Sequence, residues 1–207
     1  MKIIDISQAL EEPMAYYPSL KKFEFKWARH YSKGDSTSVS EISMASHVGT
    51  HLDSPYHFIE NGKILSEMDL SIFYGKVKVI EVPEDKDRIT ADFLKTLGQL
   101  PERILFKTKN SKMYDIKEFR EDYVYIDGDA AAYIAQFPVK LVGIDYVSVD
   151  VYKKSKEAHI TLLSRGIALL EGIVLNEVNA GVYKLACFPL KVKGAEGAPC
   201  RAVLIEE

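Results

Sequence analysis

Short apolar stretches and stretches of alternating polarity recur along the chain, and they predict a series of strands. The strands are expected at residues 2–7, 36–45, 76–82, 103–108, 140–145 and 167–170. Residues 36–45 alternate between the two faces of a strand, so this strand is expected to lead into the segment that follows it. A long irregular region with Pro13 and Pro18 separates the first two strands.

Three short helices are expected between these strands, at residues 90–97, 129–135 and 160–165. Thr90 is a suitable N-cap for the first helix, which ends near Gly98, and Gly166 ends the third. Alanine, the strongest helix former, dominates the second helix. Strands separated by single short helices favour an α/β fold.

The most informative segment of the chain runs from His47 to His57 and holds three of the five histidines. Pro55 and Gly49 disfavour a helix here, so the backbone is expected to be extended or looped. In an extended backbone His47, His51 and Asp53 point the same way. Imidazole nitrogen and carboxylate oxygen are the usual ligands of zinc and similar ions, and three ligands leave a position open for water.

A lone histidine is more often a hydrogen-bonded core or surface group than a metal ligand. Clustering reverses this expectation, because a scaffold loop has no need for several histidines and an aspartate at alternate positions. The segment therefore predicts a metal site.

The pattern His-x-Gly-Thr-His-x-Asp-x-Pro-x-His in residues 47–57 resembles the signature of the metal-dependent cyclase and kynurenine formamidase family, whose members hydrolyse amide-like bonds. Further stretches are similar to other elements of the family, namely residues 141–150, 158–159 with 169–172, and 189–191 with a second C-terminal strand at 197–202. The similarity covers nearly the whole chain. It implies a barrel-like mixed β-sheet with flanking helices.

A second ligand segment is expected around Glu171, which ends the apolar strand at residues 167–170. A buried glutamate needs a metal, an arginine or a hydrogen-bond network, because an ionised carboxylate without a partner is costly to bury. From the residues alone, Glu171 could also be exposed at the strand end, and nearby Glu177 competes for the same role. The resemblance implies that Glu171 and His159 are the ligands.

Five ligands then result: His47, His51, Asp53, His159 and Glu171. One tetrahedral ion with an open position needs three protein ligands, so five suggest two ions bridged by a carboxylate. The resemblance implies the same, with Asp53 and Glu171 as bridges. Because three ligands are imidazoles, two Zn²⁺ ions per chain are expected, with Mn²⁺ as the alternative.

His57 lies beyond Pro55 and is left over from this ligand set, and the resemblance implies that it donates and accepts protons. A histidine can protonate the leaving nitrogen of an amide attacked by metal-activated water. The alternative is a small-molecule binding module with a purely structural metal. A closed structural site would have no use for an additional histidine.

Tyr17 precedes Pro18 near the N-terminus, as an aromatic residue does in kynurenine formamidases, although their Pro-Gly-Asp continuation is replaced here by Pro-Ser-Leu. Tyr17, and with it Trp27, are candidates for stacking on an aromatic substrate, but an aromatic residue in an irregular segment is as often a loop anchor. Three substrate classes are compatible with these residues: an aryl formamide such as N-formylkynurenine, a cyclic amide such as isatin, or another small amide or ester. N-formylkynurenine as substrate would place the chain in tryptophan catabolism.

Composition agrees with a small enzyme of one domain spanning residues 1–207, since 207 residues with 47% hydrophobic content can bury a core. A net charge of −3 without a basic run argues against a nucleic-acid partner. The polar opening residues do not resemble a signal peptide, and no apolar run approaches ~20 residues, so a cytoplasmic location is expected. Cys187 and Cys200 are expected to be free thiols, with Cys187 packed in the core. A homodimer is expected from the frequency of C2 dimers and from the resemblance.

Overall fold

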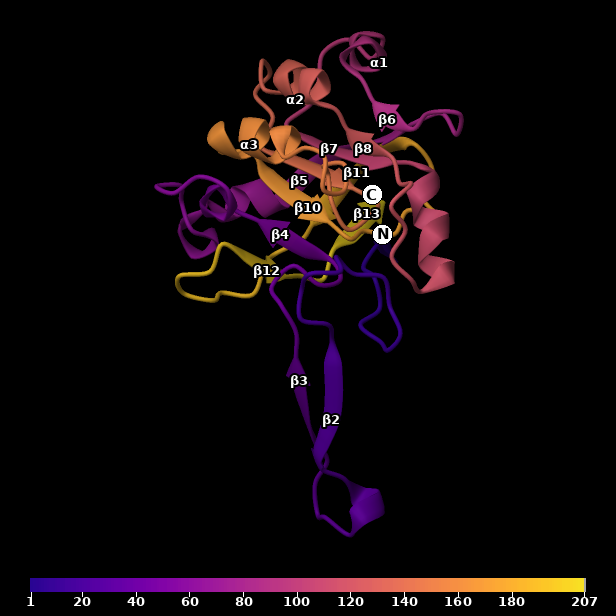
Figure 1. Cartoon of the computed structure of the whole chain (residues 1–207), viewed down its shortest axis with the longest axis vertical. Helices are drawn as coiled ribbons and strands as arrows, with labels where there is room; N and C mark the ends of the chain where they lie inside the picture. The colour runs from indigo at the N-terminus through magenta and orange to yellow at the C-terminus, as the bar shows by residue number, and fades with distance from the viewer. Residues whose placement is uncertain (207) are drawn as a thin grey trace.

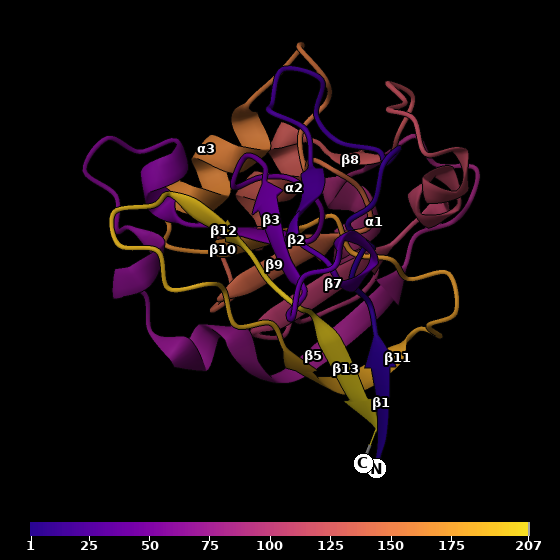
Figure 2. The ribbon, with the colours of Figure 1, turned by 90° about the horizontal axis from the view of Figure 1, so that it is seen from below.

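A nine-stranded mixed sheet forms the centre of the computed structural model, which describes residues 1–206 (Figure 1). In spatial order its strands are β1 (Lys2–Asp5), β13 (Val203–Glu206), β11 (Gly181–Ala186), β5 (Tyr74–Glu81), β7 (Arg103–Lys107), β9 (Leu141–Ile144), β10 (Ala168–Glu171), β4 (His51–Asp53) and β12 (Gly197–Pro199). The sheet is curled rather than flat (Figure 2). The α/β fold with a barrel-like sheet is therefore confirmed.

The middle of the sheet is parallel and both margins are antiparallel. β5, β7, β9 and β10 pair in parallel, and every residue of β9 and β10 is buried, as expected for strands covered on both faces. The pairs β10–β4 and β4–β12 are antiparallel. The short strand β4 is thus held between two segments that come more than a hundred residues later in the chain.

Three α-helices gather on one side of the sheet, α1 (Ala91–Lys95), α2 (Gly128–Ile134) and α3 (Glu157–Ser164) (Figure 1). A core of aliphatic side chains joins them to the sheet, including Ile104, Ile134 and Leu162. Thr90 caps α1 as predicted, since its hydroxyl accepts a hydrogen bond from the Phe93 amide. The 3₁₀ helices are Tyr31–Lys33, Pro55–His57, Leu65–Glu67, Leu70–Phe73 and Lys109–Ile116, and β6 (Arg88–Ile89) pairs with β8 (Tyr125–Ile126).

Most expected elements are present within one or two residues, and four expectations are corrected. The region after the first strand is not irregular throughout, because it contains β2 (Glu24–Arg29). The third helix begins at Glu157 and so includes His159. Residues 47–53 are not one extended stretch, because Gly49 has a φ of 72° and only β4 is a strand. The C-terminal strand pair is reduced to β12 and a single bridge between Pro189 and Cys200.

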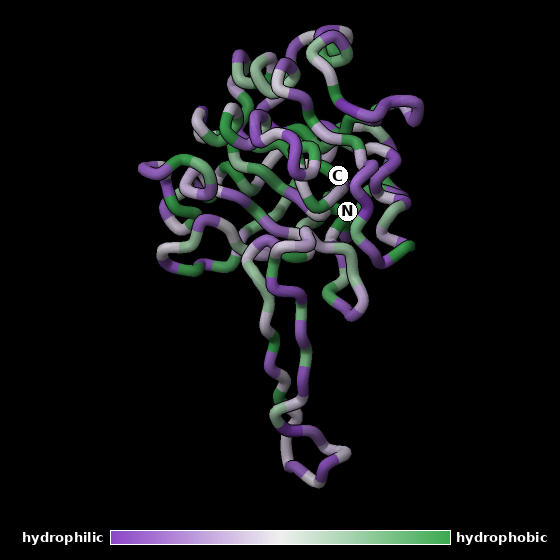
Figure 3. Tube along the Cα trace, in the orientation of Figure 1, coloured by the Kyte–Doolittle hydropathy of each residue, from purple (hydrophilic) through white to green (hydrophobic). Residues whose placement is uncertain are grey.

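The hairpin of β2 and β3 (Val39–Ser43) extends away from the rest of the molecule (Figure 1). Hydrophobic and hydrophilic residues are interspersed along it (Figure 3). All residues of both strands are exposed. Phe25 lies opposite Ile42 in the register, and its ring meets that of Trp27 edge to face at 5.1 Å, so these three side chains share one face.

Both cysteines are free, and Cys187 is buried directly after β11, as expected. Within residues 1–206, none of the helices combines the length and the hydrophobicity that crossing a bilayer requires.

Candidate metal centre

The register of β4 against β10 positions the centre. Glu171 lies opposite His51, and Leu169 lies opposite Asp53, so the end of β10 brings its carboxylate next to the two polar residues of β4. α3 places His159 on its buried side. His47 reaches the same place from the turn before β4, where Gly49 takes a left-handed backbone that other residues rarely adopt.

These elements bring together all five residues expected to hold metal. Asp53 lies among three imidazoles: its Oδ1 is 2.8 Å from His47 Nδ1 and 3.5 Å from His51 Nε2, and its Oδ2 is 3.4 Å from His159 Nε2. Glu171 contacts two of the same rings, with Oε2 3.3 Å from His51 Nε2 and Oε1 3.3 Å from His159 Nε2. The exposed Glu177 is not part of this cluster, whereas Glu171 is only 3% exposed.

The central atoms fit a bound cation. Both carboxylate oxygens of Asp53 and the Nε2 atom of His51 are buried and have no hydrogen bond with proper geometry among the described residues. Buried polar atoms without partners are rare, because each costs the free energy of desolvation. Imidazole nitrogen and carboxylate oxygen suit Zn²⁺ or Mn²⁺, and a divalent ion would satisfy all three atoms.

Other groups orient these side chains from outside. The backbone oxygen of Gly49 lies 2.9 Å from His51 Nδ1, and Asp150 Oδ2 lies 2.5 Å from His159 Nδ1. Each contact leaves the Nε2 atom of the ring directed at the cluster. The Val149 amide donates a hydrogen bond of 2.7 Å to Glu171. Such partners hold metal ligands in position and select their tautomer.

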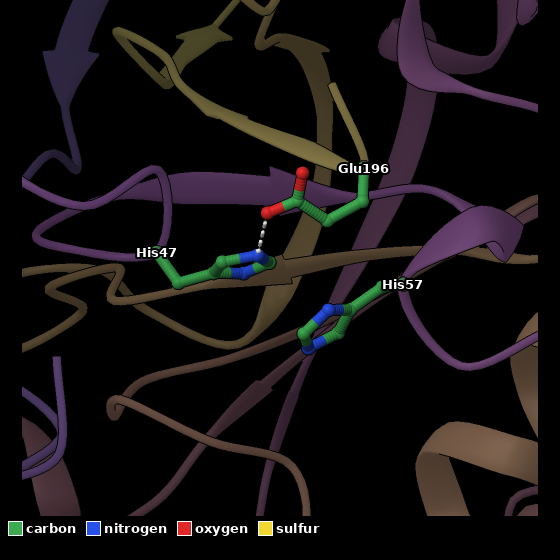
Figure 4. Close-up of side chains that lie close together, drawn as sticks. All are labelled: His47, His57 and Glu196. Atoms are coloured by element: carbon green, nitrogen blue, oxygen red, sulfur yellow. Dashed lines mark hydrogen bonds and ion pairs between the residues drawn. The ribbon is translucent and has the colours of Figure 1, made fainter. Parts of the chain in front are cut away.

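Glu196 is a member of the site that the sequence reasoning missed. Its Oε1 is 3.0 Å from His47 Nε2 (Figure 4). The same oxygen accepts a hydrogen bond of 2.8 Å from the Ser46 hydroxyl. Together with His47 and His57 it forms a second group of potential ligand atoms, all within 4.8 Å of one another. No local pattern marks this glutamate, because the pairing of β12 with β4 is what brings it to His47.

The electrostatics of the site differ between its histidines. Burial alone would lower the pKa of His47, but Asp53 and Glu196 outweigh it and raise this pKa to about 9. The pKa of His159 is also raised well above its usual range, because Glu171, Asp150 and Asp53 outweigh burial. For His57, burial dominates and lowers the pKa to about 4, so the ring is neutral at pH 7. A neutral imidazole can accept a proton or bind a metal.

His57 lies in the 3₁₀ helix Pro55–His57 and stacks on His47 with ring centroids 4.1 Å apart. It also forms a group of potential ligand atoms with Asp53 and His159. The geometry therefore allows His57 to act as a sixth ligand or as an acid-base group beside a bound metal.

A cavity of about 750 Å³ opens over the cluster. His47, His57, His159 and Glu171 reach it, and Tyr17, Leu20 and Phe58 are among its apolar lining residues. Tyr17 is held by Tyr152, with ring centroids 5.2 Å apart. Trp27 does not line this cavity, because it lies on the projecting hairpin, so within one chain the structure contradicts a substrate contact for Trp27.

Comparisons with known proteins identify the family of this chain. Residues 4–151 match the family model described as "Putative cyclase". The chain is 37% identical over 203 residues to the kynurenine formamidase of Geobacillus thermodenitrificans, covering 97% of this chain and 96% of the relative. A solved structure described as a potential metal-dependent hydrolase with cyclase activity superposes with a TM-score of 0.85 and 31% identity, covering 98% of this chain and 96% of that one. Isatin hydrolase A from Labrenzia aggregata shares the fold with a TM-score of 0.86 at 24% identity, covering 100% of this chain and 94% of that one. The chain therefore belongs to the cyclase family.

Proposed function

We propose that this protein is a metal-dependent hydrolase that cleaves a small amide-type bond. The substrate would be an N-formyl aryl amide such as N-formylkynurenine, or a cyclic amide. The environment of Asp53 is the observation that carries the proposal. Its two carboxylate oxygens are buried among three histidines and have no hydrogen-bond partner within residues 1–206. The cavity above this cluster is large enough for a small aromatic molecule. The kynurenine formamidase relative supports it.

His47, His51, Asp53, His159 and Glu171 would hold the metal, as two Zn²⁺ ions with Mn²⁺ as the alternative. A divalent ion supplies Lewis acidity, which lowers the pKa of a coordinated water and polarises a carbonyl oxygen. Asp53 and Glu171 would suit a bridging role, because Asp53 lies within 3.5 Å of three imidazoles and Glu171 lies within 3.5 Å of two.

His57 would transfer the proton to the leaving nitrogen. It borders the cavity, and its lowered pKa leaves the ring unprotonated at pH 7, ready to accept a proton from the attacking water and pass it on. Tyr17, fixed against Tyr152, would bind the aromatic part of the substrate. The apolar lining would exclude bulk water from the reacting bond.

A binding module with a structural metal is the second candidate. A structural site closes its coordination shell, whereas His57 and Glu196 add further donor atoms at the open, cavity-facing side of the cluster. This surplus favours the enzyme.

We further propose a cytoplasmic homodimer. The hairpin of β2 and β3 supports the dimer, because one of its faces carries Phe25, Trp27 and Ile42 exposed to solvent. An isolated two-stranded ribbon is marginally stable, and an exposed apolar face favours burial in an interface. We propose that a second copy of the chain covers this face, because most soluble homo-oligomers are dimers with closed two-fold symmetry.

Metal analysis of protein purified without added metal, followed by a panel of formamides, lactams and esters, tests the function. We expect close to two divalent ions per chain. Chelation should abolish hydrolysis, and adding the metal back should restore it. Asp53→Ala should lose metal and activity together, because both ions share this side chain. Full metal occupancy in Asp53→Ala would rule out the bridging assignment, and metal-loaded protein inactive on the whole panel would favour the binding module.

A further inference from the structure

Three lysines lie along the rim of the cavity, in the loop between β9 and α3. Lys153, Lys154 and Lys156 all line the cavity and are exposed to solvent. Resting on the hydrolase function proposed above, we infer that these lysines bind a carboxylate of the substrate that is separate from the scissile amide. They would thereby determine which amides are hydrolysed fast.

The positive charge of this rim is not neutralised within the described part of the chain. Ten other lysines have a carboxylate within 4.0 Å: Lys2, Lys21, Lys22, Lys26, Lys86, Lys95, Lys107, Lys112, Lys117 and Lys140. The three rim lysines have no such ion pair in residues 1–206. Instead, Lys153 Nζ lies 4.9 Å from the ring centre of Tyr152, and Lys156 Nζ lies 5.8 Å from that of Phe58. Lys153 also forms a side-chain hydrogen bond with Tyr152. These aromatic partners are uncharged, so they leave the positive charge of the ammonium groups available to an anion.

One acidic residue, Glu157, also lines the rim, but its carboxylate is directed at α2. A Cβ added to Gly128, the first residue of α2, would lie 2.2 Å from Glu157 Oε2. The other carboxylates that line the cavity lie at its base, where Glu171 and Asp150 contact His159. The rim therefore keeps an excess of positive charge beside the entrance.

The amides at the start of α3 do not supply an alternative anion site, because side chains already satisfy them. Ser155 accepts a hydrogen bond from the Glu157 amide, and Asp150 accepts those of Ala158 and His159. An anion at this rim would have to bind the lysine side chains.

The layout of the cavity then specifies the chemical class of the substrate. The lining residues grade from buried to exposed: the metal cluster contributes buried His159 and Glu171, apolar side chains such as Tyr17, Leu20 and Phe58 are partly buried, and the three lysines are exposed. An aromatic N-acyl amine with a carboxylate on the side remote from the scissile bond matches these three zones. A neutral cyclic amide such as isatin matches only the first two.

A matched pair of substrates tests the rim. 4-Formamidophenylacetate and its neutral carboxamide differ in one charge, so the ratio of their kcat/KM values isolates the contribution of the carboxylate. We expect the metal-loaded protein to prefer the carboxylate. Replacing all three rim lysines by glutamine should lower kcat/KM for the carboxylate roughly tenfold, mainly through KM, because each exposed ion pair contributes up to a few-fold. Hydrolysis of the carboxamide should not change.

Lys76→Gln combined with Lys191→Gln is the control. Both lysines are exposed, and neither lines the cavity, so the control changes net charge without changing the rim. It should leave both substrates unaffected. In the wild type, added salt should reduce the preference for the carboxylate, since it screens exposed charges.

Binding of the product analogue 4-aminophenylacetate, measured by calorimetry, gives a readout that needs no turnover. We expect its Kd to rise about tenfold in the triple variant and not in the control. Equal losses on both substrates, no preference in the wild type, or an unchanged Kd in the triple variant would overturn the role of the rim. Metal-loaded protein that hydrolyses neither of these substrates nor any compound of the panel, but binds the analogue through the rim, would instead refute the hydrolase function and leave the anion site standing.

Discussion

Among the single residues of the centre, His57 is the one whose position allows both an acid-base role and metal binding. Its contacts include ring stacking on His47 and an edge-to-face contact with Phe58. If His57 transfers protons without holding metal, His57→Ala should keep its metal and lose turnover roughly a hundredfold. His51→Ala should lose both. Metal analysis and initial rates on the same preparations measure this.

Leaving-group chemistry supplies the control for His57. The loss in His57→Ala should shrink for an activated aryl ester, because a good leaving group departs without a proton. Equal losses for good and poor leaving groups, or loss of metal, would make His57 a ligand or a positioning residue instead.

Asp145 is a buried carboxyl group whose ionisation should be visible in stability. Burial raises its pKa from 3.8 to about 6, against hydrogen bonds from the amides and hydroxyls of Thr108 and Ser111. With a raised pKa, the folded state binds more protons than the unfolded state between about pH 4 and 6. This contribution to the free energy of unfolding is therefore full at low pH and is lost as pH rises, by about 3 kcal/mol in all.

Asp145→Asn checks this sign. The variant should be less stable than the wild type at every pH, because an amide cannot accept all four hydrogen bonds. Its deficit should shrink as pH rises from 4 to 7, since the wild type alone loses the Asp145 contribution. Urea denaturation of both proteins across this range measures the difference. A deficit that grows with pH would show that the four donors hold the pKa below its usual value.

Among the elements, the contact between the end of β10 and the turn before β4 holds the two ligand segments together. Gly172 has a φ of 71°, and a Cβ there would lie 2.2 Å from the backbone oxygen of Gly49. Gly172→Ala should force these segments apart and separate Glu171 from His51. We expect it to lower both metal affinity and the free energy of unfolding, the latter by several kcal/mol.

Gly166→Ala is a matched control, because Gly166 has a φ of 74° but nothing within 4 Å of an added Cβ. It should cost only about 1–2 kcal/mol of backbone strain and leave metal binding intact. Urea denaturation and metal titration of the two variants measure the contrast. Similar losses in both would mean that strain, and not the close approach of the two segments, explains the effect of Gly172→Ala.

For the whole molecule, the β2–β3 hairpin predicts the oligomeric state. Trp27→Ser with Ile42→Ser removes apolar surface from one face, so the proposed dimer should dissociate at concentrations where the wild type stays associated. Sedimentation velocity over a dilution series measures this. Lys26→Ser with Glu41→Ser changes a cross-strand ion pair in the same hairpin, and it should leave the dimer intact. A monomeric wild type, or equal dissociation in both variants, would contradict the proposal.

The sequence by itself determined the local features of this protein. The strands and helices of the core follow from short periodic patterns and caps, such as Thr90 before α1, because these depend on neighbouring residues. The ligand types were also readable, since His51 and Asp53 are two residues apart and share a face of β4 whatever β4 pairs with. The resemblance to a family added His159 and Glu171 from a distant segment.

Only the tertiary structure decided which distant segments meet. Strand order is a property of long-range pairing, and nothing in residues 51–53 specifies that β10 and β12 will flank them. That pairing brought Glu196 to His47, and it set Glu171, but not Glu177, against His51. β2 was overlooked although Phe25 and Trp27 alternate with Lys26 as strand residues do, so this strand did have a local signal in the sequence. The three rim lysines also could not be identified from the sequence. A run of charged residues indicates a solvated loop, and only the fold places this run beside a cavity.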